Sequence, residues 1–102
     1  GPSWLNLEDD AQANRMGYVT RYASYAPDED FVEIISNYVT NPDGYWDAVL
    51  TTAGASGAPK LKAKMAIVRL WLAESWGIDI DKLRDIVQRR SDEVLKLDFD
   101  AI

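Results

Sequence analysis

The sequence predicts an all-α fold, an irregular bundle of four or five helices that forms a single domain over residues 1–102. Apolar residues recur every three or four positions in several segments, which is the spacing of one helix face. No segment shows the alternation of a half-buried strand, and glycines and prolines separate the periodic segments as they do where helices end. With 102 residues, 47% of them apolar, the chain can bury one modest core.

Two helices are predicted in the first half of the chain. A short helix over residues 8–16 is followed by a loop or extended segment over residues 18–26. The second helix begins at Pro27, whose fixed φ suits the first helical position, and the acidic residues after it complement the positive end of the helix. This helix runs to about Thr40, because the residue before Pro42 disfavours helical geometry.

The second half predicts three further elements. A third helix covers residues 43–53, and the composition of residues 54–59 is typical of a loop. A long helix over residues 59–76 and a last helix that Asp79 caps and that fades near Leu97 complete the bundle. The long helix carries its apolar residues at helical spacing: Leu61, Met65, Val68, Leu72 and Trp76.

Composition excludes several classes of function. The net charge of −6 disfavours nucleic acid and anionic membranes as partners. The chain has no cysteine and no histidine, so it cannot form disulfides or build a typical zinc site alone. It shows no membrane span and no signal-peptide pattern. It starts with Gly1-Pro2 instead of methionine, which indicates a part of a longer protein.

One face of the second predicted helix is polar and carries Glu29 and Glu33 one turn apart. The simplest interpretation is a solvated face whose acidic residues favour the helix N-terminus. The functional interpretation adds Tyr22, which lies seven residues before Glu29 in a loop that can fold back on the helix. A carboxylate can bind a metal ion, and a phenol can donate a hydrogen bond to the oxyanion formed during carbonyl hydrolysis.

Residues 22–33, YASYAPDEDFVE, and residues 71–87, WLAESWGIDIDKLRDIV, resemble a family of zinc-binding metallopeptidases of the zincin type. Members of this family are lipoproteins found near nutrient-import systems of gut Gram-negative bacteria. The resemblance covers most of residues 17–90. It implies that the chain is the C-terminal helical subdomain of a longer zinc metallopeptidase.

By the same resemblance, Glu29 is the third protein ligand of zinc, Tyr22 is the phenol that stabilises the transition state, and Glu33 is a supporting carboxylate. The family's two histidine ligands and its catalytic glutamate lie in an upstream HExxH motif, which this chain lacks. The resemblance therefore implies zinc in the parent protein and none bound by this chain alone, which is inactive by itself. It also implies a peptide or protein substrate and a lipid-anchored parent, periplasmic or at the cell surface, that associates with an outer-membrane import system.

The alternative is a standalone acidic helical module that binds another protein and has no catalytic role. Four tryptophans and five tyrosines are many for this length, and large aromatics mark interfaces as well as cores. Trp71 and Trp76 are expected in the core, whereas Trp4 or Trp46, if exposed, would mark where a missing half docks. If the chain is part of a longer protein, it is expected to expose an apolar patch where the upstream half docks, or to cover that patch by forming a dimer.

Overall fold

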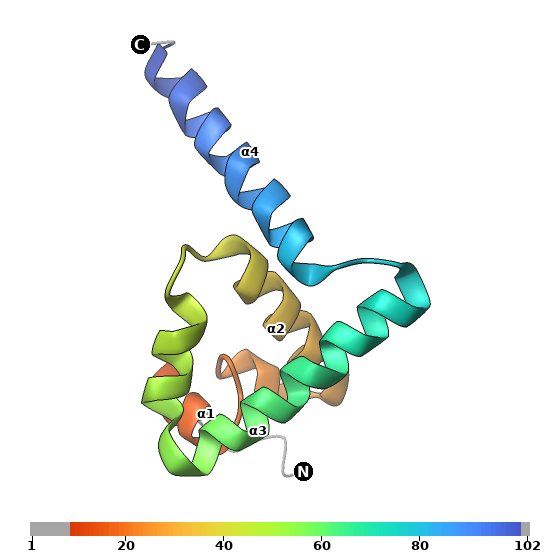
Figure 1. The fold of residues 1–102 in the computed structure, drawn as a ribbon. Helices are drawn as coiled ribbons and strands as arrows, with labels where there is room; N and C mark the ends of the chain where they lie inside the picture. Colours follow the sequence, from red (N-terminus) through yellow and green to blue (C-terminus); the bar gives the residue numbers. More distant parts are fainter. Residues whose placement is uncertain (1–8, 101–102) are drawn as a thin grey trace.

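The computed structural model describes residues 9–100, and its described part consists of helices without a strand. Four α-helices and one short 3₁₀ helix follow one another along the chain (Figure 1). They are α1 (Asp10–Met16), η1 (Tyr22–Tyr25), α2 (Pro27–Thr40), α3 (Tyr45–Trp76) and α4 (Ile80–Asp100). The predicted all-α bundle is therefore confirmed.

Local capping chemistry sets most of these boundaries. The Asp9 carboxylate accepts a hydrogen bond from the backbone N–H of Gln12 at 2.8 Å and so caps α1. Pro27 is the first residue of α2, as predicted. The Asp79 carboxylate accepts from the backbone N–H groups of Asp81 at 2.9 Å and Lys82 at 3.3 Å, which fixes the start of α4.

The loop predicted over residues 54–59 is wrong, because the chain stays helical there apart from Gly54. At Gly54 φ is 68° and ψ is −164°, a combination that is almost confined to glycine, and the helix kinks at this residue. Gly57 has a different role, since a Cβ at this position would lie 2.0 Å from the Asn14 carbonyl oxygen. The composition of the segment therefore reflects a bend and a close approach of α3 to α1.

The core lies between α2, α3 and the start of α4. Its largest fully buried side chains are Ile34, Leu61, Val68 and Ile80. The α3 residues at helical spacing, from Leu61 to Leu72, form the buried face of that helix as predicted.

Trp71 and Trp76 were expected in the core and are exposed instead, by 49% and 65%. Their rings contact each other edge to face, with centroids 6.2 Å apart. Trp71 lies beside the buried face of α3, next to Leu72, and Trp76 is the last residue of the helix. Trp4 was named as a possible docking residue and lies outside the described residues.

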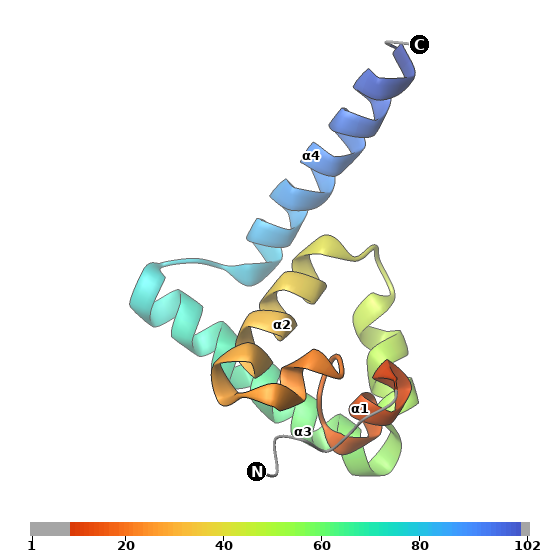
Figure 2. The same ribbon diagram turned by 180° about the vertical axis from the view of Figure 1, so that it is seen from behind.

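The helix α4 leaves the body of the molecule after its first turns. Both views show α1, η1, α2 and α3 gathered together while the far end of α4 extends away from them (Figures 1 and 2). Residues 89–97 of α4 are exposed. None of the described helices is both long and apolar enough to cross a membrane.

Candidate functional site

Tyr22 opens the 3₁₀ helix η1, which packs against α2. Its ring is half exposed and meets the Tyr25 ring edge to face, with centroids 5.7 Å apart. Its hydroxyl oxygen accepts a hydrogen bond from Arg21 Nη2 at 3.2 Å, and the Arg21 guanidinium lies 5.0 Å from the ring centroid. Among the described residues, no group accepts a hydrogen bond from the Tyr22 hydroxyl.

Glu29 lies exposed in the first turn of α2. Among the described residues, no hydrogen bond or ion pair involves its carboxylate. The same holds for Asp28, which precedes it. Glu29 is thus available to a ligand from outside this part of the chain, and neither Arg15 nor Arg21 binds it.

Asp30, the next residue, is buried and paired. One of its carboxylate oxygens lies 2.6 Å from Lys64 Nζ, and the other has no hydrogen-bond partner among the described residues. Burial raises the pKa of Asp30, and the hydrogen bond and charge of Lys64 oppose that shift. Lys64 also donates to the Gly17 carbonyl at 2.7 Å and lies 4.1 Å from the Tyr18 ring centroid. A single ammonium group thus joins α2, α3 and the end of α1.

Glu33 is bound within the chain. Its Oε2 accepts hydrogen bonds from the Thr20 hydroxyl at 3.2 Å and from Asn37 Nδ2 at 2.8 Å. The Thr20 hydroxyl in turn accepts from the backbone N–H of Ala23 at 3.3 Å. Glu33 therefore connects α2 to the segment that carries Tyr22.

The two sequence-predicted groups with free functional atoms, Tyr22 and Glu29, lie on elements that are packed together. Sequence analysis missed Thr20, Asp30 and Lys64, which position these elements. These contacts join residues that are distant in the sequence, so local patterns do not reveal them. Asp30 and Lys64 are 34 positions apart, and the Thr20–Glu33 hydrogen bond spans 13 residues.

The described residues do not make a complete zinc site. No group of three or more acidic, histidine or cysteine side chains that could hold a metal exists among them. A carboxylate oxygen is an ordinary zinc ligand, and Glu29 offers one without a competing partner. A complete site would need two or three further donors from another segment.

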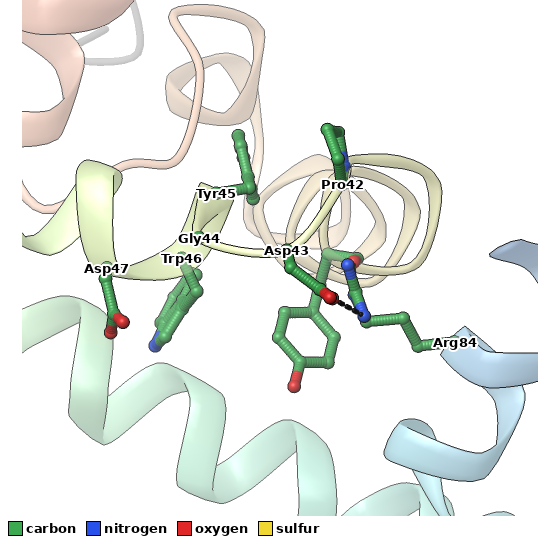
Figure 3. A pocket seen from close by; sticks show the side chains of 8 residues that line it. Pro42, Asp43, Gly44, Tyr45, Trp46, Asp47 and Arg84 are labelled. Atoms are coloured by element: carbon green, nitrogen blue, oxygen red, sulfur yellow. Dashed lines mark hydrogen bonds and ion pairs between the residues drawn. The ribbon is translucent and has the colours of Figure 1, made fainter.

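A separate pocket lies at the other end of α2, where the chain turns into α3 (Figure 3). Its volume is about 230 Å³, and its lining includes Tyr45, Trp46 and Arg84. Figure 3 shows Asp43 reaching Arg84, and the two charged groups lie 2.8 Å apart. Burial raises the pKa of Tyr45 to about 12. None of the predicted site residues lines this pocket, and Trp46 is half-buried against the Tyr38 ring.

Comparison with known proteins identifies the relatives of this chain. The family described as "Putative zinc-binding metallo-peptidase" matches residues 1–81. A comparison with curated proteins gives no match.

One solved structure is similar over nearly the whole chain. It is the 2.10 Å crystal structure of a "putative zinc-binding metallo-peptidase" from Bacteroides caccae ATCC 43185. The TM-score is 0.84 and the sequence identity 35%, over 95% of this chain and 37% of that one. The present chain thus spans little more than a third of the length of this relative.

Proposed function

The chain belongs to the zinc-binding metallo-peptidase family, and we propose that it is the C-terminal helical part of a secreted zinc metallopeptidase. In this proposal the whole protein hydrolyses peptide bonds. The present chain contributes one zinc ligand and one hydrogen-bond donor, and it is inactive alone.

The availability of Glu29 carries the proposal. Asp30 is paired with Lys64, and Glu33 is bound by Thr20 and Asn37, whereas Glu29 and Asp28 have no partner among the described residues. Of these two carboxylates, the family resemblance selects Glu29. We assign Glu29 as the third protein ligand of zinc. The remaining ligands and the catalytic base come from an upstream HExxH segment of the same polypeptide, because this chain contains no histidine.

Zinc, when bound, supplies Lewis-acid polarisation of the peptide carbonyl and lowers the pKa of a coordinated water. Tyr22 would donate a hydrogen bond to the oxyanion that develops on that carbonyl. The hydrogen bond from Arg21 to the phenolic oxygen supports this role, since it leaves the phenolic hydrogen free and polarises the O–H bond. Tyr25 is less suited, because it has no such donor on its oxygen in the described residues.

Glu33 has a supporting role in this proposal. Its Oε2 holds Thr20 and Asn37, so it fixes the segment before Tyr22 against the helix that bears Glu29. Its second oxygen remains available to orient a zinc ligand from the upstream segment.

The substrate class and location follow from the family resemblance. We propose a peptide or protein substrate and a parent that is a lipoprotein of a Gram-negative bacterium, periplasmic or at the cell surface. An association with an outer-membrane nutrient-import system belongs to the same proposal. The net charge of −6 agrees with a partner other than nucleic acid.

The decisive experiment substitutes Glu29→Gln in the whole protein. Glutamine keeps the shape of the side chain but is a poor zinc ligand, so zinc content should fall from about one ion per chain to roughly a tenth or less. Elemental analysis after gel filtration measures the metal, and circular dichroism checks that the fold is kept. Asp28→Asn is the matched control, because it removes the adjacent exposed carboxylate and should leave zinc in place.

Unchanged zinc content in Glu29→Gln would refute the assignment. A second variant separates the phenol from the metal. Tyr22→Phe should retain zinc and lower kcat by about 10²-fold or more, the effect of losing one oxyanion donor. A full kcat in Tyr22→Phe would remove Tyr22 from the mechanism.

A standalone interaction module remains the second candidate, and one observation favours it. Large apolar side chains, Trp71 and Trp76 among them, are exposed on α3. Under that alternative Glu29→Gln changes neither metal content nor activity.

A further inference from the structure

An apolar groove runs between α2 and α3 on the side of the molecule where the tryptophans are exposed. Its volume is about 430 Å³, and Phe31, Val32 and Ile35 of α2 and Ile67, Val68 and Trp71 of α3 line it, together with Asp28. Of these residues, Val32 is 58% exposed, Ile67 54% and Trp71 49%. We call this surface the α2–α3 groove.

This surface is unfavourable in water. Four of its side chains, those of Phe31, Val32, Ile67 and Trp71, are large, apolar and more than one-third exposed. Covering such a groove removes apolar surface from water, which favours association. Contiguous exposed apolar patches of this kind mark interaction sites.

The groove borders the proposed zinc ligand. Glu29 and Val32 are three residues apart on α2, so their side chains are neighbours on the helix surface. A segment that supplied further ligands to a zinc ion held by Glu29 would have to pack against this part of α2. Asp28 lines the groove and Glu29 follows it in the first turn of α2, so a segment that docks in the groove lies close to Glu29.

We propose that the α2–α3 groove is the docking surface for the remainder of the polypeptide, which places apolar side chains between α2 and α3. This inference rests on the proposed function. The chain covers only 37% of its Bacteroides caccae relative, so a whole protein of this kind has ample further chain to fill the groove. Docking there holds the upstream ligands next to Glu29 through apolar contacts that do not require the metal.

Cysteine labelling of the whole protein tests the proposal, because the present chain has no cysteine of its own. Val32→Cys and Ile67→Cys each place a thiol in the groove with little change in volume, and any upstream cysteine is replaced by serine. Ile86→Cys is the matched control, since Ile86 is 44% exposed on α4 and does not line the groove. N-ethylmaleimide reacts with each variant in native buffer and in urea.

The groove thiols should react about 100-fold more slowly in native buffer than in urea, and the Ile86→Cys thiol within about tenfold of its urea rate. Chelation of zinc should leave this protection in place. Groove thiols that react as fast as the control would overturn the proposal. So would protection that weakens on dilution, which indicates a second copy, or protection seen only with added peptide, which indicates a substrate pocket.

Failure of the proposed function gives a different pattern. If Glu29→Gln retains zinc while the groove thiols stay protected, Glu29 is not a ligand but the groove is still covered. If Glu29→Gln loses zinc while the groove thiols react freely, Glu29 is a ligand and the docking surface lies elsewhere.

Discussion

The two ends of α2 differ in how completely their polar groups are used. At the N-terminal end, Asp28 and Glu29 have no partner among the described residues, and Phe31 and Val32 expose apolar surface beside them. At the C-terminal end nearly every polar group is bound within the chain.

The C-terminal end is tied to α3 and α4 by a continuous network. The Tyr38 hydroxyl donates to Asp81 Oδ1 at 2.5 Å, and Arg69 binds both oxygens of the same carboxylate. Arg84 donates to the Tyr38 and Asn41 carbonyls at 3.1 and 2.8 Å, which satisfies backbone groups at the end of α2.

This contrast distinguishes residues that stabilise the fold from residues that are available to bind another molecule. Polar groups that are fully bound inside the chain contribute to stability, and their loss changes the free energy of unfolding. Unpartnered groups beside an exposed apolar surface contribute little to stability, and their loss should change binding instead. Asp30 lies between these two groups of residues. It is in the first turn of α2, next to the unpartnered Glu29, but it is buried and paired.

The largest expected effect on stability is at Asp30. Asp30→Asn leaves the Lys64 ammonium partly buried without its counter-charge, and breaking such a pair costs about 2–4 kcal/mol. Urea unfolding followed by circular dichroism measures this loss. Asp28→Asn and Glu29→Gln, on the same turn, should each stay within about 0.5 kcal/mol of the parent chain.

The outcome of Asp30→Asn shows whether Asp30 maintains the fold or belongs with the unpartnered residues at the N-terminal end of α2. Lys64→Met in the Asp30→Asn background removes the stranded charge and should recover part of the loss. A stability unchanged by Asp30→Asn would mean that the Asp30–Lys64 pair does not stabilise the fold, and Asp30 would then belong with Glu29.

A smaller effect is expected at the C-terminal end, from Asp81→Asn. The Asp81 carboxylate is more than half exposed, so losing its bonds to Arg69 and Tyr38 should lower stability by about 1 kcal/mol at pH 7. Those two hydrogen bonds hold the pKa of Asp81 below its ordinary value of 3.8. Its contribution is therefore fully present above that value and is lost as the pH falls through the lower folded-state pKa.

The difference in stability between the parent chain and Asp81→Asn should therefore shrink toward zero as the pH falls through 3.8 and below. Asp85→Asn is the control, because Asp85 is exposed on α4 and its carboxylate makes no hydrogen bond or ion pair with the described residues. A difference that stays constant on acidification would show that the Asp81 charge does not hold α4 to the body.

Local signals in the sequence were sufficient to predict most of the fold. The proline at position 27, the glycines after α1 and α3 and the carboxylate of Asp79 act within a few residues of the boundary they set. Such effects can be read from the sequence without knowledge of the tertiary structure. The kink at Gly54 was mistaken for a loop because composition does not distinguish one bent residue from six.

The candidate site was predictable only as far as residue types and spacing allow. Tyr22 and Glu29 stand out because a phenol and a carboxylate seven residues apart match a known pattern. The pairing of Asp30 with Lys64 and of Glu33 with Thr20 depends on how the helices pack. Helical spacing predicted the buried face of α3, but the exposure of Trp71, next to Leu72 at the edge of that face, depends on which helices pack against it.

The bend at Gly54 sets the angle between the two segments of α3, residues 45–53 and residues 55–76. Its φ of 68° is the mirror image of what L-amino acids prefer. The backbone conformation at this position suits a D-amino acid. Among the genetically encoded amino acids, only glycine, which is achiral, adopts it without strain. D-alanine introduced there by chemical ligation would fit the bend. L-alanine would change the angle between the segment of α3 that lines the α2–α3 groove and the segment that carries Trp46.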